Sequence, residues 1–318
     1  MLKTKKYIIV FTAFIICISA ATQIYINVIK KRGSIELSIV GDIMLSRGVD
    51  SYISKNGYSY PYENLKNIFL ADDLTIVNLE CPITEYGRGA NKPERFVFKA
   101  KTENANAMKE AGIDLCNLAN NHTMDYRSEG LKDTMENLSK AGISYVGAGA
   151  NANTDMSYIF EKDGFKIGVL AYSIFPPEGF VYDENSPGIN YLVDHEDLKS
   201  YRIREDLKKL KADFKIIYFH WGIEYEPFAG IRQKELARIA IDSGADFIVG
   251  AHPHVIQDKE VYKGKYIYYS LGNCIFDKQI PKGSDEGLLL SLSIDKFKNI
   301  NIKEKRFKIK LGQPILIK

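Results

Sequence analysis

Five apolar runs in this chain have the length and residue types of β-strands, and each leads into a polar residue that can bind a metal ion. Helical segments lie between several of these runs, which is the pattern of parallel strands joined by helices. Because the carboxyl ends of the strands in an open α/β sheet line one crevice, we expect the residues that follow the runs to converge. They are Asp42, Glu80, Asn121, His220, His252 and His254.

Two of these candidates, His252 and His254, stand one residue apart after the run Phe247-Ile248-Val249. Extended spacing would project both imidazoles to the same side of the chain, and neutral imidazole is the commonest metal-binding side chain. An isolated pair of this kind is more often a turn with two surface histidines. Here His122 and His220 occupy similar positions at the ends of apolar runs, which favours a shared metal site.

The six candidate ligands combine carboxylate, amide oxygen and imidazole donors. This mixture suits divalent Zn, Mn or Fe, and it exceeds what one tetrahedral ion needs. Two ions bridged by a shared carboxylate would use the whole set, and such a centre activates water for hydrolysis. The sequence therefore predicts one or two divalent metal ions.

The remaining segments predict one α/β domain that spans residues 33–318. Helical spacing is present at 101–111, 128–141, 195–210 and 234–243. Asp163-Gly164 is the turn dipeptide of a β-hairpin, a second hairpin signal spans 261–270, and the chain is strand-like from residue 288. Strands that alternate with helices and then give way to hairpins predict mixed β-sheets.

The N-terminal residues 1–32 predict a membrane segment that precedes the domain. Residues 7–29 form an uncharged stretch of 23 residues, which as a helix is long enough to cross about 30 Å of hydrocarbon. We expect a basic cytoplasmic stub and a single-pass anchor in the cell membrane, with the domain extracellular. A cleaved signal peptide is the alternative, because Ser19-Ala20-Ala21 supplies the small residues that signal peptidase prefers.

The charge of the chain gives no argument for nucleic acid as a partner. There are 43 basic and 40 acidic side chains, but six of the basic residues flank the uncharged N-terminal stretch. Without these six the chain carries 37 basic and 40 acidic side chains, so the predicted domain is mildly acidic. Its three cysteines, Cys81, Cys116 and Cys274, cannot all pair and are interpreted as small apolar residues.

Six motifs in this chain give it a specific resemblance to the bacterial capsule-synthesis CapA family, which includes the poly-γ-glutamate PgsA proteins. Its members have a calcineurin-like metallophosphatase fold, so the resemblance implies a layered sandwich of mixed β-sheets flanked by helices. The motifs lie within about residues 35–277, and they are Gly41-Asp42-Ile43-Met44 with Arg47-Gly48-Val49-Asp50, Asn78-Leu79-Glu80, Leu118-Ala119-Asn120-Asn121-His122 with Asp125, His220-Trp221-Gly222-Ile223-Glu224-Tyr225, Gly250-Ala251-His252-Pro253-His254, and Tyr269-Ser270-Leu271-Gly272-Asn273.

The resemblance also implies a role for each candidate residue. Asp42 and His254 would hold one metal ion, Asn121, His220 and His252 the other, and Glu80 would bridge them. His122 would act as the general acid beside the leaving group, with Asp125 and Asn120 as its catalytic neighbours. Arg47 and Glu224 would contact the substrate, although a structural hydrogen bond is the commoner role for a residue such as Glu224.

Two residues depart from the pattern of a standard metallophosphatase. Such an enzyme opens with D-x-H, whereas Met44 stands where that histidine belongs, and it has Asp at the bridging position where this chain has Glu80. One of the two ions therefore loses a strong ligand. We expect either a single ion bound tightly or a second one bound more weakly.

The resemblance implies a function in the synthesis, export or attachment of a capsule polymer such as poly-γ-glutamate. The corresponding reaction would be metal-dependent hydrolysis of a phosphoester or amide bond. The alternative is a non-catalytic assembly or polymer-binding subunit of a membrane polymer synthase. The expected partners are accordingly the anionic surface polymer or the membrane synthase subunits.

A second candidate for polymer contact is the segment 305–311, in which basic and apolar residues alternate. The simpler interpretation is a half-buried edge strand whose lysines oppose pairing with another sheet edge. A basic stripe that follows a polyanion or anionic lipid headgroups is the alternative.

Overall fold

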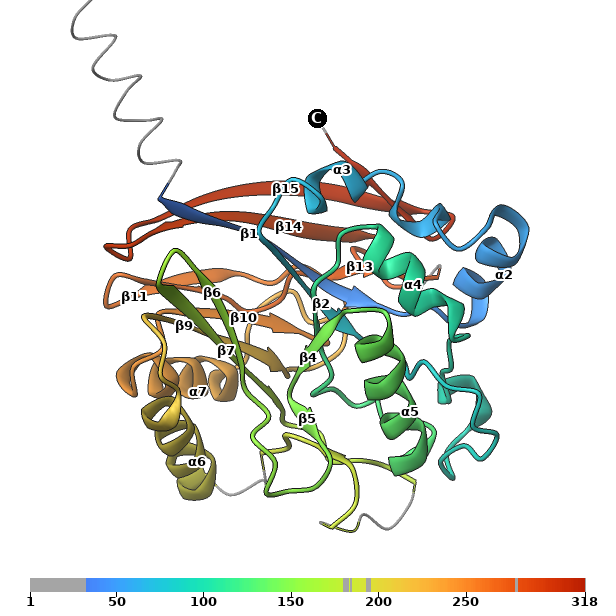
Figure 1. Cartoon of the computed structure of the whole chain (residues 1–318), viewed down its shortest axis with the longest axis horizontal. Helices are drawn as coiled ribbons and strands as arrows, with labels where there is room; N and C mark the ends of the chain where they lie inside the picture. Colours follow the sequence, from blue (N-terminus) through green and yellow to red (C-terminus); the bar gives the residue numbers. More distant parts are fainter. Residues whose placement is uncertain (1–32, 180–182, 184, 193–195, 278–279, 318) are drawn as a thin grey trace, which may run out of the picture.

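The computed structural model describes residues 33–179, 183, 185–192, 196–277 and 280–317. Two large β-sheets are stacked face to face, and helices cover the outer side of each sheet (Figure 1). The predicted membrane segment at 1–32 lies outside the described residues. Among those that are described, no helix combines the length and the apolar character needed to cross a bilayer.

The first sheet has the strand order β16-β15-β14-β1-β2-β3-β4, with β13 paired to the end of β1. Strands β1 to β4 are parallel, whereas β14, β15 and β16 are antiparallel to their neighbours. The bounds are β1 Ser34–Ile43, β2 Leu74–Leu79, β3 Leu115–Asn117, β4 Ser144–Val146, β13 Asn273–Ile275, β14 Glu286–Asp295, β15 Ile300–Lys310 and β16 Gln313–Leu316.

The second sheet has the order β11-β12-β10-β9-β7-β6. Its four central strands are parallel, and the outer strands β6 and β11 are the antiparallel arms of the two predicted hairpins. The bounds are β6 Tyr158–Lys162, β7 Phe165–Ser173, β9 Phe214–His220, β10 Phe247–Ala251, β11 Lys259–Tyr262 and β12 Lys265–Tyr268. A small third sheet pairs β5 (Ala148–Gly149) with β8 (Gly188–Ile189).

Six α-helices connect the strands in the described part of the chain, and four of them match the predicted helical segments. They are α2 Arg47–Asn56, α3 Lys66–Phe69, α4 Glu103–Glu110, α5 Arg127–Lys140, α6 Glu196–Lys209 and α7 Ile231–Asp242, with short 3-10 turns at Tyr60–Tyr62 and Glu94–Phe96. Helices α2 to α5 pack on the outer face of the first sheet, and α6 and α7 pack on the second sheet.

Three apolar cores separate the four layers. The core between the sheets contains alternate residues of β1 and β14, such as Leu37 and Leu290, facing strands β9 and β10. The other two cores lie between each sheet and its helices. The expected α/β class, with mixed sheets flanked by helices, is therefore confirmed. The strand ends meet differently from the prediction, because they come from two stacked sheets and not from one open sheet.

The segment 305–311 is not an edge strand over most of its length. Residues 307–310 of β15 pair with β16 on one side, and β15 pairs with β14 on the other. The alternation itself is present, because Phe307 is buried while Arg306 and Lys308 are exposed. The edge prediction failed because a two-residue turn after Lys310 returns the chain as one more short strand.

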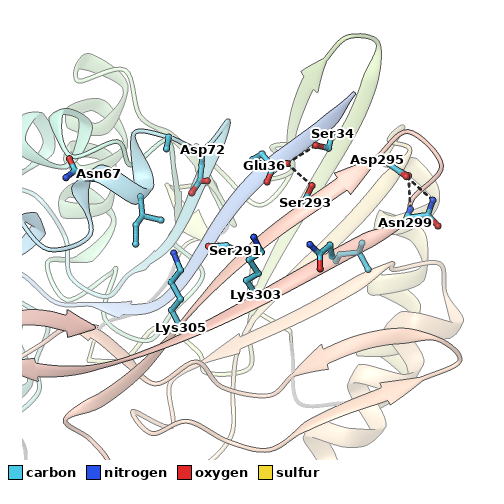
Figure 2. A pocket seen from close by; sticks show the side chains of 14 residues that line it. Ser34, Glu36, Asn67, Asp72, Ser291, Ser293, Asp295, Asn299, Lys303 and Lys305 are labelled. Carbon is cyan, nitrogen blue, oxygen red and sulfur yellow. Dashed lines mark hydrogen bonds between the residues drawn. The ribbon is translucent and has the colours of Figure 1, made fainter. Parts of the chain in front are cut away.

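A polar hollow of about 810 Å³ lies on the outer face of the first sheet, where the helices leave β1, β14 and β15 uncovered (Figure 2). Glu36 accepts hydrogen bonds of 2.7 Å from the hydroxyls of Ser34 and Ser293 within it. Lys303 and Lys305 line the opposite side. None of the predicted metal ligands borders this hollow, so it is separate from the candidate centre.

Two glycines bring the backbone segments of the candidate centre together. A β-carbon on Gly41 would lie 1.9 Å from the carbonyl oxygen of Gly272, and one on Gly250 would lie 2.1 Å from that of Tyr269. Neither contact can relax by a side-chain rotation, because the obstructing atoms belong to the backbone. The close approach therefore requires glycine beside the predicted ligands.

Replacing Gly41 by alanine should destabilise the fold, because β1 would have to move away from Gly272. We expect Gly41→Ala to lower the free energy of unfolding by about 1–3 kcal/mol, the range typical of overpacked interiors. Gly87→Ala is the matched control, because its added methyl meets no atom within 4 Å, and the change should stay within about 0.5 kcal/mol. Urea denaturation measures both, and equal effects would contradict the account.

Candidate metal centre

The structure brings five of the predicted ligands together where the carboxyl ends of strands from the two sheets meet. Asp42 is the penultimate residue of β1, Glu80 directly follows β2, and His220 ends β9. His252 and His254 come directly after β10, which is the strand paired with β9. Asp42, Glu80 and His220 are fully buried, whereas His252 and His254 are 5% and 4% exposed. The centre therefore opens to solvent on the side of the histidine pair.

The five side chains form two groups that share Glu80. One consists of Glu80, His220 and His252, and the other of Asp42, Glu80 and His254, with the ligand atoms in each group within 4.8 Å of one another. The Nε2 atoms of His220 and His254 lie 3.8 Å and 3.7 Å from Glu80 Oε1. The buried side chains can thus hold a metal ion in either group.

The hydrogen bonding around Glu80 fits a cation. Neither carboxylate oxygen of Glu80, nor Nδ1 of His252, has a hydrogen-bond partner among the described residues, although all three atoms are buried. A buried carboxylate without a partner is costly, and it is normally compensated by a charge or a metal ion. The donor set and the unpartnered atoms therefore suit a divalent ion.

The backbone at the histidine pair differs from the extended chain that the sequence suggested. His252 has a φ of +96° and His254 a φ of +57°, so both residues lie in the left-handed region. A positive φ is uncommon for residues other than glycine and costs of the order of 1–3 kcal/mol at functional sites. As a result, the two imidazoles serve different groups around Glu80, with their ring centroids 5.8 Å apart.

The electrostatics of the centre separate its histidines. Burial and the neighbouring imidazoles hold the pKa values of His220 and His252 well below the usual range, so both rings are neutral and can donate a lone pair. Burial also lowers the pKa of His254, but the carboxylates of Glu80 and Asp42 outweigh it and raise that pKa to about 9. Burial and the charge of Asp42 raise the pKa of Glu80 well above its usual range.

Two asparagines that were not predicted as site residues orient the ligands. The side-chain amide of Asn78 donates a 2.7 Å hydrogen bond to Asp42 Oδ1, and Asn273 Oδ1 lies 2.9 Å from His254 Nδ1. Such contacts fix the ring orientation of a metal-binding histidine. Asn78 lies near the carboxyl end of β2, so the rule that selected Asp42 could also have selected it, whereas Asn273 begins β13 and is marked only by its place in a quoted motif.

The predicted general acid, His122, is held by a buried carboxylate. His122 Nδ1 lies 2.9 Å from Asp125 Oδ2, and Lys92 Nζ lies 2.5 Å from the other oxygen of Asp125. The ring stacks on Phe98 with the centroids 4.1 Å apart. Burial lowers the pKa of His122, and Asp125 partly opposes that shift. Lys92 and Phe98 lie in irregular segments that carried no sequence signal.

The two asparagines before His122 have different surroundings. Asn121 Oδ1 lies 2.8 Å from His220 Nε2, so both atoms face the same side of the centre. Asn120 uses its side chain within the protein: it donates to Leu79 O at 2.8 Å and accepts from the backbone N–H of Thr123 at 2.9 Å. These bonds fix the loop, and the predicted catalytic role of Asn120 stays a prediction.

Arg47 and Glu224, the predicted substrate contacts, lie at the edge of the centre. The guanidinium of Arg47 lies 4.5 Å from the ring centroid of Phe98 and 2.6 Å from Asp277 Oδ1, and its side chain is 32% exposed. Glu224 is exposed, and its charge is near enough to raise the pKa values of Glu80 and His254. Both are therefore in reach of a ligand.

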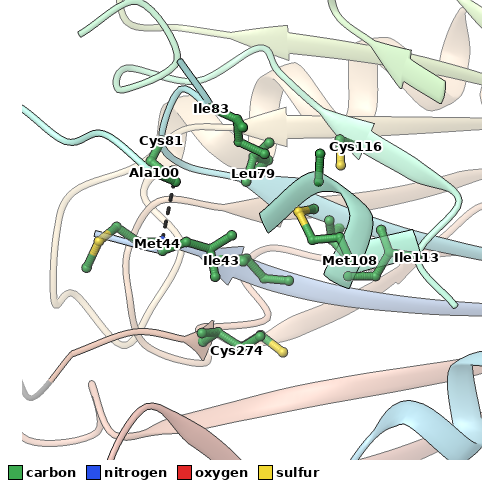
Figure 3. Packing of buried hydrophobic residues seen from close by; sticks show 14 of the residues in the cluster. Ile43, Met44, Leu79, Cys81, Ile83, Ala100, Met108, Ile113, Cys116 and Cys274 are labelled. Carbon is green, nitrogen blue, oxygen red and sulfur yellow. Dashed lines mark hydrogen bonds between the residues drawn. The ribbon is translucent and has the colours of Figure 1, made fainter. Parts of the chain in front are cut away.

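Met44, at the position of the absent histidine, is part of the apolar core. Figure 3 shows it among the buried side chains between the first sheet and its helices. Its sulfur accepts a 3.1 Å hydrogen bond from the backbone N–H of Ser46. The nearby Cys81, Cys116 and Cys274 are buried free thiols, and burial raises the pKa of Cys81 to about 12. These thiols are thus small apolar residues, as interpreted.

Comparison with known proteins places this arrangement in a family. The family model described as "Bacterial capsule synthesis protein PGA_cap" matches residues 36–278, a range that includes every predicted ligand. The chain belongs to this bacterial capsule synthesis family. Members of the PGA_cap family are therefore the appropriate reference for the arrangement around Glu80.

Three relatives illustrate the similarity. The capsule biosynthesis protein CapA of Bacillus anthracis is 34% identical over 82% of this chain and 64% of its own length. The PGA biosynthesis protein CapA of Bacillus subtilis (strain 168) is 34% identical over 79% and 66%. A probable polyglutamine synthesis accessory protein of Mycobacterium tuberculosis is 29% identical over 65% and 56%. The PGA_cap chain thus matches less than two thirds of each relative.

Metal content should depend on Glu80 more than on any other ligand, because both groups share this residue. We expect the purified protein, after incubation with Mn²⁺ and desalting, to retain one to two ions per chain by elemental analysis. Glu80→Gln should remove nearly all of this metal, and His252→Ala should remove at most one ion. Glu235→Gln, which changes an exposed glutamate on α7, is the control and should leave the content unchanged.

Metal binding should release protons, because an ion in the group with Asp42 must displace the proton of His254. With a pKa of about 9, His254 is protonated at pH 7.5, so affinity for that ion should rise with pH and level off above about pH 9. Titration calorimetry at pH 7.5, in buffers of different ionisation enthalpy, should show about one proton released for this ion. Binding without proton release would contradict the assignment.

Proposed function

We propose that this PGA_cap protein is a metal-dependent hydrolase of metallophosphatase type. It would act outside the cytoplasmic membrane, held by the N-terminal segment 1–32, in the synthesis, export or attachment of a capsule polymer such as poly-γ-glutamate. The observation that carries the proposal is the pair of buried ligand groups that share Glu80, whose two oxygens have no other partner among the described residues.

The residues around the centre supply the remaining parts of a hydrolytic reaction. Divalent ions, when bound, supply Lewis acidity and a nucleophilic water at neutral pH. His122, whose Nδ1 is held by Asp125, would in its protonated form donate a proton from Nε2 to the leaving group. Arg47 offers a guanidinium to the anionic group of a phosphoester or of a carboxylate-bearing polymer. Each of these roles is a proposal for this chain.

The polymer is proposed from the relatives. Two of them are named for capsule or PGA biosynthesis and one for polyglutamine synthesis. The shared family supports a role in capsule-polymer synthesis. Because the chain matches less than two thirds of the relatives' length, the family does not identify the bond that would be hydrolysed. A phosphoester and an amide are both compatible with a carboxylate-bridged pair of divalent ions.

A non-catalytic role as an assembly or polymer-binding subunit of a membrane synthase is the second candidate. Two observations favour it: the mycobacterial relative is named an accessory protein, and Met44 supplies a hydrogen-bonded thioether in the core at the position of a metal-binding histidine. In that case the metal ions would stabilise the fold and shape a binding surface. The partner would be a synthase subunit or the anionic polymer.

Turnover that depends on His122 distinguishes the two functions. We expect the full-length, Mn²⁺-loaded protein to hydrolyse a phosphodiester or a γ-glutamyl polymer, and His122→Ala to lower kcat by about 10²–10⁴-fold, the usual contribution of a general acid. The metal content of His122→Ala should match that of the parent, since no predicted ligand is lost. An intact metal centre with polymer binding and no turnover would instead support the assembly subunit.

A further inference from the structure

The segment 221–231, which runs from the end of β9 to the first residue of α7, exposes three large apolar side chains. Ile223, Phe228 and Ile231 are 69%, 72% and 77% exposed, which places them among the most exposed large apolar residues of the described chain. Single apolar residues on a surface are ordinary, whereas several within one short loop mark a contact surface. We call this segment the β9–α7 loop.

The loop is held firmly, although it exposes these side chains. The amide of Gln257 donates hydrogen bonds to the carbonyls of Glu226 and Phe228 at 2.9 Å and 3.3 Å. Asp258 accepts the backbone N–H of Ala229 at 2.7 Å. Tyr225 has a φ of +66°, a strained conformation for a bulky residue. The loop therefore presents a preorganised surface.

The loop lies on the open side of the metal centre. It begins directly after the ligand His220, and the backbone N–H of Tyr225 donates a 2.7 Å hydrogen bond to the carbonyl of Pro253, between the two other histidines. The rings of Tyr225 and His254 are 6.1 Å apart. A ligand whose polar group reaches His254 would therefore extend past Tyr225 onto the loop.

The charge of the loop indicates what kind of apolar group it fits. Residues 221–235 contain the acidic residues Glu224, Glu226 and Glu235 and the basic residues Arg232 and Lys234, so the loop and the start of α7 carry no net positive charge. An anionic bilayer surface attracts clusters of basic residues, and this segment has no such cluster. The apolar part of an individual ligand needs no basic cluster, because only the ligand's polar group is anionic and that group would lie at the metal ions and Arg47.

We propose that the substrate of this centre is an amphiphile, a phosphoester of a long-chain alcohol, whose apolar chain lies on Ile223, Phe228 and Ile231. This inference rests on the proposed function, because it uses the same centre for the phosphoester. Each methylene that the loop removes from water would tighten binding by up to about fourfold. Partial burial of four methylenes gives an expected gain of about tenfold or more.

Alkyl phosphates of different length test the inference without turnover. The probes are ethyl phosphate and hexyl phosphate, titrated calorimetrically into the full-length, Mn²⁺-loaded protein in nanodiscs, with empty nanodiscs subtracted. Hexyl phosphate should bind the parent at least about tenfold more tightly than ethyl phosphate. Phe228→Ser should reduce this ratio by severalfold and leave the affinity for ethyl phosphate unchanged. Equal affinity of the parent for both probes would overturn the proposal.

Phe297→Ser is the matched control. Phe297 is 73% exposed, but it follows Asp295, which pairs with Ser34 at the start of β1. Asp42 lies eight positions after Ser34 along β1, about 26 Å of extended chain, and Figure 1 shows the β14–β15 turn beside the start of β1. The control should keep the parental ratio, and an equal loss in both variants would overturn the proposal.

The outcome separates this inference from the proposed hydrolase function. A tenfold preference for hexyl phosphate that depends on Phe228, in a protein without hydrolytic turnover, would support the amphiphile site and contradict the hydrolase. Turnover that depends on His122, with no preference for the longer probe, would support the hydrolase and contradict the amphiphile site. If the loop instead contacts a protein or the bilayer, turnover would depend on His122 and the two probes would bind with equal affinity.

Discussion

The buried carboxylate of Glu80 is the constraint on which the arrangement of the strand ends depends. It lies beside Asp42, and neither of its oxygens has a hydrogen-bond partner in the described part of the chain. Two carboxyl groups in such surroundings cost several kcal/mol unless cations compensate them. The protein places the neutral imidazoles of His220 and His252 beside this pair, and only His254, whose pKa is raised to about 9, is protonated at neutral pH. One imidazolium compensates only part of the charge of two carboxylates, so the local electrostatics favour divalent ions.

The scaffold explains how such an unfavourable cluster is maintained. Parallel strands of two stacked sheets end at the same level, and glycines at positions 41 and 250 let the strand ends pass backbone to backbone. Asn78 and Asn273 orient Asp42 and His254 through side-chain hydrogen bonds. The left-handed backbone at His252 places its ring in the group with Glu80 and His220, apart from the group that contains His254. Packing of the three apolar cores stabilises the fold and offsets the free-energy cost of these local conformations. The site can therefore be strained while the fold around it is regular.

Much of the fold could be predicted from the sequence, because the apolar periodicity fixes which residues face a core. The strands that end at Asp42 and His220, the hairpin at Asp163-Gly164 and most helices follow from such patterns. Periodicity does not say which sheet a strand joins, so the stacking of two sheets came only from the family resemblance. The left-handed backbone at His252 was missed because no local rule requires it there. Lys92 and Phe98 come from irregular segments, where tertiary contacts alone define their place.

The central claim is that Glu80 is shared by two metal positions. Anomalous diffraction from crystals of the Mn²⁺-loaded protein, measured on both sides of the manganese absorption edge, tests it most directly. The account predicts two anomalous peaks about 3.5–4 Å apart, one beside His220 and His252 and the other beside Asp42 and His254, with Glu80 contacting both. Manganese bound only at surface carboxylates, or a single ion that Glu80 does not contact, would contradict the account.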